Sequence, residues 1–275
     1  MYHQFKELAD VDITKEPMEV GPAQHYVMGG VEVDPDTGAS IVPGLFAAGE
    51  VSGGMHGSNR LGGNSLSDLL VFGRRAGMGA VQYLDSLEGA RPTASDAELE
   101  AARAEALAPL ERSGGENPYT VHAEVQQTMS DLVGIIRKAE EIKAALAELE
   151  KLRTRAANVS AEGGTAYNPG WHMALDLRNI MLIADCVAEA ALERQESRGG
   201  HTRDDFPQMS PEWRKINLIC TLDGDRIAIR QQPMPPMRPD LLALFDTGEL
   251  KKYYTDAELP PAAATATPPA SEEKS

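Results

Sequence analysis

Two kinds of hydrophobic pattern divide the chain. Over residues 16–92 the apolar positions form short runs broken by glycine and proline, which is typical of strands and turns. Over residues 93–207 they recur at alternating spacings of three and four, which predicts amphipathic helices. Residues 216–231 alternate apolar and polar positions around Asp223-Gly224, which predicts a β-hairpin with a two-residue turn.

Helix-start signals support the helical part of this pattern. Ser95 and Glu98 have the spacing of a capping box. Asn117 and Asn168 each precede a proline, and this pair of residues is typical of an N-cap followed by the first helical position. We therefore expect an antiparallel helical bundle over residues 93–207.

A glycine-rich loop over residues 53–63 leads into another predicted helix. Ser65 and Asp68 have the spacing of a helix N-terminus with an acidic residue in its first turn, where backbone N–H groups favour a negative group or an electron-rich carbonyl. The loop is neither a Walker loop nor the Gly-x-Gly-x-x-Gly dinucleotide fingerprint. Tight backbone packing is the alternative explanation, and Gly73 and Gly77 predict close packing of the helix that follows.

Polar side chains near this loop are candidates for binding a ligand. His56 and Arg60 lie inside the loop, and arginine is a natural bidentate partner of a carboxylate. His25 would add a second donor if the fold brings it near. Glu50 follows a predicted short buried strand at residues 41–49, where nucleotide sites place the acid that accepts ribose hydroxyls. A structural histidine and a strand-end carboxylate are the alternatives.

Composition restricts the class of protein further. The chain has 42 Asp and Glu against 26 Lys and Arg and a net charge of −16, which argues against nucleic-acid binding because phosphates need a basic face. No apolar run reaches 18 residues, and the N-terminus lacks the apolar segment of a secretory signal. Two cysteines, Cys186 and Cys220, exclude a disulfide scaffold and are expected in the core. No metal-ligand spacing occurs. We expect a soluble, acidic, intracellular globular protein.

Three motifs in order carry a resemblance to a known family: residues 24–30 (QHYVMGG), 44–50 (GLFAAGE) and 56–66 (HGSNRLGGNSL). Residues 171–179 and 196–207 also resemble that family's helical domain. On these residues the chain resembles the flavoprotein subunit of succinate dehydrogenase and fumarate reductase, over residues 12–215. L-Aspartate oxidases share His-Gly-x-Asn-Arg but typically continue with Met-Ala-Ser, so Leu-Gly-Gly at residues 61–63 favours the dicarboxylate oxidoreductases.

The resemblance implies a role for each candidate residue. His25 and Arg60 would bind the carboxylates of succinate or fumarate, and Glu50 would bind the ribose of FAD. Ser65 and Leu66 would meet the flavin through backbone N–H groups at the helix N-terminus. Hydride would pass between the substrate C–C bond and the flavin, with a proton transferred at the opposite carbon. The family's proton-transfer arginine belongs to its capping domain, so no residue of this chain is assigned a catalytic role.

The fold class expected is α+β: the C-terminal edge of an FAD-binding α/β domain, an antiparallel helical bundle and a terminal β-hairpin. The domains expected are a remnant of the capping domain at 1–15, the FAD-binding part at 16–92, the bundle at 93–207, the hairpin region at 208–256 and a disordered tail at 257–275. The family's FAD fingerprint and its covalent flavin histidine have no counterpart in these residues. We therefore expect this chain alone to bind FAD weakly or not at all and to be inactive.

The resemblance also implies partners. Electrons from succinate would pass through FAD to an iron–sulfur subunit and then to quinone, and membrane anchor subunits would hold the chain peripherally at the cytoplasmic face of the plasma membrane. Two alternatives stay open at this point: a non-catalytic dicarboxylate-binding or assembly module, and a relative of soluble fumarate reductase or L-aspartate oxidase. The basic residues Arg198, His201 and Arg203 are expected to dock the bundle on the flavin domain, with contact to the flavin or a partner subunit as the alternative.

Overall fold

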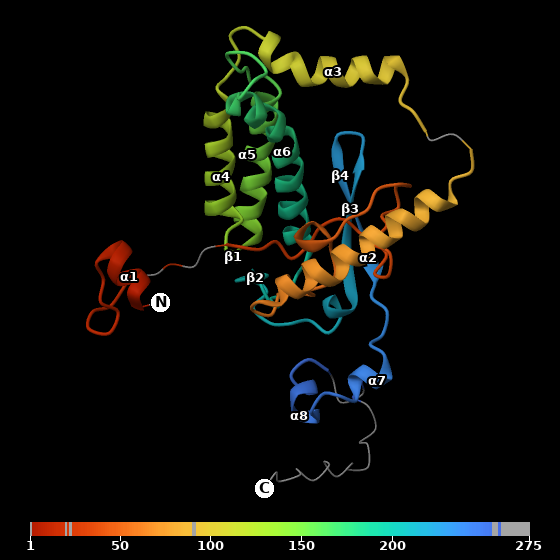
Figure 1. Ribbon diagram of the computed structural model, residues 1–275. Helices are drawn as coiled ribbons and strands as arrows, with labels where there is room; N and C mark the ends of the chain where they lie inside the picture. Colours follow the sequence, from red (N-terminus) through yellow and green to blue (C-terminus); the bar gives the residue numbers. More distant parts are fainter. Residues whose placement is uncertain (1, 20, 22–23, 90–91, 255–257, 260–275) are drawn as a thin grey trace. The chain divides into compact units, whose positions relative to one another are not determined.

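A computed structural model of the chain describes residues 2–19, 21, 24–89, 92–254 and 258–259 (Figure 1). The chain divides into two compact units, Met1–Glu88 and Gly89–Ser275. We refer to them as unit 1 and unit 2. Nearly all of the tail that was predicted to be disordered, residues 257–275, lies outside the described residues.

Unit 1 consists of irregular backbone and one long helix. Its elements are α1 (Tyr2–Ala9), the 3-10 turn η1 (Gly49–Val51) and α2 (Asn64–Ser86). In its described part the predicted strands are reduced to isolated bridges, Val31 with Ser52 and Ala39 with Phe46. The buried strand predicted at residues 41–49 is wrong, because Ile41 is 82% exposed and Gly44 turns the chain with a φ of +84°.

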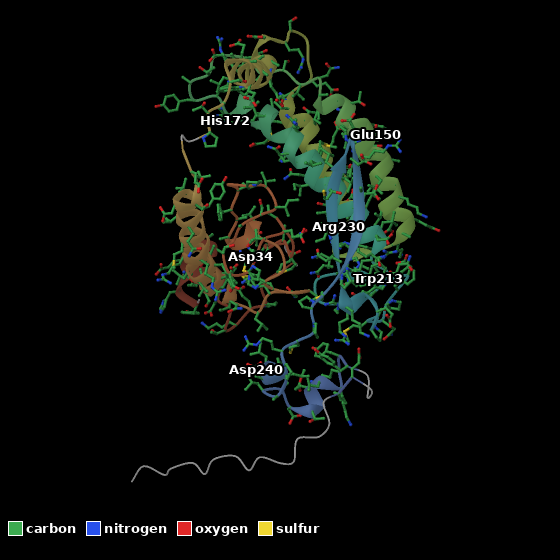
Figure 2. All side chains as sticks on the ribbon, turned by 90° about the vertical axis from the view of Figure 1, so that its right-hand side faces the viewer. Asp34, Glu150, His172, Trp213, Arg230 and Asp240 are labelled. Carbon is green, nitrogen blue, oxygen red and sulfur yellow. The ribbon has the colours of Figure 1, made fainter. Side chains whose placement is uncertain are left out.

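On α2, the close backbone approach is made by a glycine that the sequence pattern did not single out. A Cβ on Gly79 of α2 would lie 2.3 Å from the carbonyl oxygen of Thr37. That carbonyl belongs to the turn of Asp34 (Figure 2), whose Oδ1 accepts hydrogen bonds from the backbone and hydroxyl of Thr37. Gly73 and Gly77, predicted to pack closely, would meet nothing within 4 Å.

Helix α2 buries few of its side chains. Its buried residues are Asp68, Ala76 and Gly79. Apolar side chains along the helix are exposed, among them Leu66, Leu69, Leu70, Met78, Val81 and Leu84. The burial in unit 1 therefore involves one side of this helix.

Unit 2 is built around helices with a shared apolar core. The helices are α3 (Asp96–Glu111), α4 (Pro118–Leu132), α5 (Ala139–Ala156) and α6 (Pro169–Glu193). Helices α4, α5 and α6 run side by side (Figure 1). The fully buried apolar side chains between them include Val121, Ile142, Ala145, Leu149, Leu152 and Leu177. The helical bundle predicted from the periodicity is therefore present in α4, α5 and α6, whereas α3 is mostly exposed and contributes no residue to this core.

The predicted helix starts are confirmed. Ser95 and Glu98 form the reciprocal hydrogen bonds of a capping box at α3. The side chain of Asn117 accepts from the N–H of Tyr119 at α4, and that of Asn168 accepts from the N–H of Trp171 at α6. Each asparagine is followed by proline at the first helical position.

Short strands complete unit 2. A parallel pair joins β1 (Ile136–Arg137) to β2 (Thr202–Arg203). The hairpin pairs β3 (Ile216–Asp223) with β4 (Arg226–Pro233). Because Asp223 faces Arg226 in the register, the two turn residues are Gly224-Asp225 rather than the predicted Asp223-Gly224, and Gly224 supplies the positive φ of +61°.

The remaining short helices of unit 2 are η2 (Trp213–Lys215), α7 (Pro239–Leu242) and α8 (Thr247–Leu250). Within the parts of the chain that the structure describes, the helices are too short or too polar to span a bilayer.

The two cysteines, predicted to lie in the core, are half-buried and unbridged. Cys186 lies on α6 and Cys220 on β3, with the Cys220 Sγ 3.9 Å from the carbonyl oxygen of Cys186.

Candidate functional site

The glycine-rich loop ends at the N-terminus of α2, where backbone carbonyls of the loop accept from the N–H groups of Asn64 and Leu66. Gly63 is the N-cap residue of α2, and no side chain caps the helix there. A Cβ on Gly62 or Gly63 would meet nothing within 4 Å, so tight packing does not explain these two glycines. The spacing predicted Asp68 in the first turn of this helix. Because the helix begins at Asn64, Asp68 lies in the second turn instead.

Arg60 is held at this helix N-terminus from two sides. Its Nη1 donates to the Ser65 Oγ at 3.2 Å and to the carbonyl of Gly62. The face of its guanidinium lies over the ring of Tyr26, 4.8 Å from the ring centroid. Its Nε is buried and makes no hydrogen bond within the described part of the chain. One edge of a fixed guanidinium therefore keeps its hydrogen-bonding capacity.

A buried carboxylate lies below this arginine. The Asp68 side chain is 3% exposed, and its Oδ2 accepts from the Tyr26 hydroxyl at 3.4 Å and lies 3.2 Å from the His56 Nε2. The rings of Tyr26 and His56 meet edge to face, with centroids 5.4 Å apart. Burial, followed by the Asp68 charge, raises the pKa of Tyr26, so the phenol stays protonated and donates. The other Asp68 oxygen, Oδ1, is buried without a partner among the described residues.

The structure brings only some of the predicted site residues together. Arg60 contacts Ser65 through the hydrogen bond to its hydroxyl. Glu50 is exposed, and its Oε1 accepts from the N–H of Val27, two residues after His25. His25 itself is exposed and makes no hydrogen bond to a described residue, and Leu66 is 67% exposed. No hydrogen bond or ring contact is seen between His25 and Arg60 within the described residues.

Tyr26 and Asp68 were missed as site residues. Tyr26 follows His25 directly, but the 42 residues that separate it from Asp68 form no local pattern. The signal available was an acidic residue among apolar neighbours near the start of a helix. Spacing alone predicts that Asp68 is a first-turn charge, which would be exposed to solvent, whereas its side chain is 3% exposed in the structure.

Residues of the predicted docking cluster make contacts within unit 2. Arg203 is 1% exposed, and its Nη1 donates to the carbonyls of Ala191, Leu192 and Arg194 at the end of α6. His201 Nε2 bonds the Arg194 carbonyl, while Arg137 donates to its Nδ1. Two of the three residues therefore close the C-terminal end of α6 inside unit 2 and form no free basic surface, because their polar atoms are already satisfied.

Burial also sets the charge state of this part of unit 2. It lowers the pKa of His201 to about 4, with the nearby arginines acting in the same direction. The imidazole is therefore neutral at pH 7. Arg198 joins this arrangement through its backbone, whose N–H donates to the His201 carbonyl at 2.8 Å, while its side-chain Nε donates to the buried Glu196 at 3.1 Å.

Comparison with known proteins defines the class first. Residues 1–66 match the model of an FAD binding domain, and residues 122–240 match the model "Fumarate reductase flavoprotein C-term". The chain is 37% identical over 228 residues to the fumarate reductase flavoprotein subunit of Mycobacterium tuberculosis, covering 80% of this chain and 39% of that relative. It is 35% identical over 247 residues to the succinate dehydrogenase flavoprotein subunit of Coxiella burnetii, covering 86% and 42%. The class is therefore an FAD-dependent flavoprotein.

A solved structure supports the same assignment. The Mycobacterium smegmatis Sdh1 complex in the apo form matches with a TM-score of 0.84 and 61% identity, covering 94% of this chain and 44% of that one. This chain belongs to the succinate dehydrogenase/fumarate reductase flavoprotein family, a family of FAD-dependent oxidoreductases. The resemblance and the α+β fold class predicted from the sequence are confirmed. The chain spans about two fifths of the length of the curated relatives it matches.

Proposed function

We propose that this chain contributes the substrate-binding edge of an enzyme that interconverts succinate and fumarate. The observation that carries the proposal is the environment of Arg60. Its Nη1 is engaged by Ser65 and Gly62, whereas its Nε–Nη2 edge makes no hydrogen bond within the described part of the chain. A fixed guanidinium whose buried Nε lacks a partner among the described residues fits bidentate binding of a carboxylate on its Nε–Nη2 edge.

His25 is the proposed second contact for the substrate. A dicarboxylate has a charged group at each end, so two separate donors fix the C–C bond between them in position. The exposed His25 imidazole makes no hydrogen bond within the described residues and is available for this role. Because His25 precedes Tyr26, whose ring supports Arg60, the two proposed contacts come from connected parts of unit 1.

The residues of unit 1 also fit FAD. When bound, FAD supplies the ring that exchanges hydride with the substrate. One oxygen of Glu50 is held by the N–H of Val27, and its other oxygen is available to accept a ribose hydroxyl. At the start of α2, which no side chain caps, the helix dipole and the backbone N–H groups at Ser65 and Leu66 would favour negative charge on the reduced flavin, although the Leu66 N–H also donates to the Gly63 carbonyl at 3.0 Å. The absence of a side-chain cap at Gly63 is the structural feature that supports this fit.

We further propose that electrons leave through an iron–sulfur subunit to quinone, with membrane anchor subunits that place the complex at the cytoplasmic face of the plasma membrane. The similarity to the Mycobacterium smegmatis Sdh1 complex supports this assembly. The 275 residues contain no Gly-x-Gly-x-x-Gly pyrophosphate loop. We therefore expect the 275-residue chain by itself to bind FAD weakly or not at all and to lack turnover. Stoichiometric flavin absorbance and succinate turnover in the purified chain would contradict this expectation.

The experiment that tests the function is a succinate–acceptor assay on the complete flavoprotein subunit that contains these residues. Arg60→Lys replaces a planar fork by a point charge, and we expect it to lower kcat/KM about 10- to 100-fold. Arg74→Lys, at an exposed position of α2, is the matched control and should leave kcat/KM unchanged. An unchanged kcat/KM in Arg60→Lys removes Arg60 from the site, and absence of turnover in the unaltered subunit overturns the proposed function.

A further inference from the structure

Unit 1 contains a buried charged group that the proposed chemistry does not use. Asp68 lies in the second turn of α2, with its side chain 3% exposed. A buried carboxylate is costly unless it is paired and hydrogen-bonded. Here it has two polar neighbours, Tyr26 and His56, and both belong to the loops on which the predicted ligand-binding residues lie. The placement of a costly charge at this point requires an explanation.

The contacts of Asp68 lead to Arg60 in two steps. The Tyr26 hydroxyl donates to the Asp68 Oδ2 at 3.4 Å, which fixes the rotation of the Tyr26 ring about its side-chain bonds. His56, 3.2 Å from the same oxygen, meets that ring edge to face, with the ring centroids 5.4 Å apart. The Arg60 guanidinium lies over the ring face at 4.8 Å. Asp68 itself makes no hydrogen bond to Arg60.

The alternative roles of this carboxylate fit the structure less well. Asp68 does not cap α2, because it lies beyond the first turn and the N-cap residue is Gly63. It does not form a direct ion pair with Arg60, since the arginine hydrogen bonds go to Ser65 and Gly62. Its 3% exposure also separates it from solvent. The described side-chain contacts of Asp68 go to His56 and to Tyr26, the ring on which the Arg60 guanidinium lies.

We propose that Asp68 is a positioning residue for dicarboxylate binding: through Tyr26 and His56 it holds the aromatic platform that fixes the Arg60 guanidinium. This inference rests on the proposed function for its substrate, but its geometric part concerns only residues of unit 1. Orientation matters because a bidentate arginine–carboxylate pair requires both N–H groups to face the ligand in one plane. A misplacement by a fraction of an ångström weakens both bonds together.

The first test measures the arginine directly in the 275-residue chain. With ¹⁵N-labelled arginine, the Arg60 Nε–H signal is assigned by its loss in Arg60→Lys. We expect exchange of this proton with water to be about tenfold faster in Asp68→Asn, because the platform loses its charged acceptor. Asp85→Asn, an exposed acid on the same helix, is the matched control and should leave the exchange rate unchanged. Unchanged exchange in a folded Asp68→Asn chain overturns the proposal.

Two further variants keep this test decisive if Asp68→Asn disturbs the folding of unit 1. Tyr26→Phe keeps the ring but removes the hydroxyl that bonds Asp68, and it should also speed the Arg60 exchange. Asp68→Glu restores a carboxylate and should recover part of the protection that the amide loses. If Tyr26→Phe leaves the exchange rate as it is in the unaltered chain, Asp68 does not act through this ring and the proposal is wrong.

The second test uses the complete flavoprotein subunit and separates positioning from a general structural role. Asp68→Asn should raise the KM for succinate about tenfold with a smaller change in kcat, since substrate binding is what a displaced Arg60 loses first. In an Arg60→Lys background the same substitution should have little further effect on KM. Additive effects would overturn the proposal. Altered Arg60 exchange in a subunit without succinate turnover would support the positioning role while overturning the proposed function.

Discussion

Arg203 and Asp205 form a two-pronged ion pair at the C-terminal end of α6. The Nε of Arg203 lies 2.8 Å from the Asp205 Oδ1, and its Nη2 lies 2.8 Å from Oδ2. The remaining nitrogen of the guanidinium bonds carbonyls at the end of α6. One buried side chain therefore satisfies both the helix terminus and a carboxylate.

Removing this arginine should destabilise unit 2 strongly. Arg203→Met leaves the α6 carbonyls and Asp205 without their donor, and we expect a loss of about 3 kcal/mol or more in the free energy of unfolding. The matched control is Arg178→Met, whose ion pair with Glu105 is exposed and should change stability by less than about 1 kcal/mol. Urea unfolding followed by circular dichroism measures both. Equal losses in the two variants would show that the buried pair has no special role.

His201 should make the stability of unit 2 depend on pH. Its folded pKa of about 4 lies below the value near 6.5 of an unfolded histidine, because burial disfavours the charged form. Between these values the unfolded state binds more protons. The contribution of the neutral His201 to the free energy of unfolding is therefore complete above about pH 6.5 and is lost as the pH falls towards about 4. Urea midpoints across this range should fall less steeply in His201→Gln, whereas the exposed His172→Gln serves as the control and should keep the steep fall.

Two of the three glycines of α2, Gly73 and Gly79, should respond in opposite directions to alanine. In Gly79→Ala the new Cβ overlaps the Thr37 carbonyl, and we expect a loss of about 1–3 kcal/mol. In Gly73→Ala the new methyl meets nothing within 4 Å, so helix propensity should stabilise α2 by about 0.5–1 kcal/mol. Thermal unfolding of the two variants provides the comparison. A stabilised Gly79→Ala variant would contradict the packing seen between α2 and the turn at Thr37.

The Cys220 thiol should react at lower pH than an ordinary cysteine. A hydrogen bond from the Cys186 thiol lowers the pKa of Cys220 to about 7 and raises that of Cys186. Alkylation of Cys220 by iodoacetamide, followed by peptide mass spectrometry, should therefore rise with a midpoint near pH 7. In Cys186→Ala the midpoint should move up towards about 8.5. A midpoint that is unchanged by this substitution would mean that Cys186 does not stabilise the thiolate.

The sequence predicted the helical part of the fold better than the rest because helix signals are local. The caps at Ser95, Asn117 and Asn168 depend on residues two or three positions away. The strand predicted at residues 41–49 failed for the opposite reason. A short apolar run does not reveal whether other strands pair with it, and here the Pro43-Gly44 turn interrupts it.

In the candidate site, too, local contacts could be predicted from the sequence and distant ones could not. Arg60 was found because it lies inside a recognisable loop, and its contact with Ser65 spans only five residues. Asp68 was assigned to the wrong turn, since the exact start of a helix is set by its cap geometry rather than by spacing alone. The hydrogen bond between Tyr26 and Asp68 joins segments 42 residues apart, and one sequence contains no pattern that reports such a contact.

The uneven burial of the two units affects how long the chain survives in a cell. Unit 2 encloses its own apolar core, whereas α2 of unit 1 keeps leucines at the surface. Exposed apolar segments of this kind are what chaperones and proteases engage. We therefore expect a protein that covers α2 to raise the abundance of this chain more than added stability in the helical bundle does.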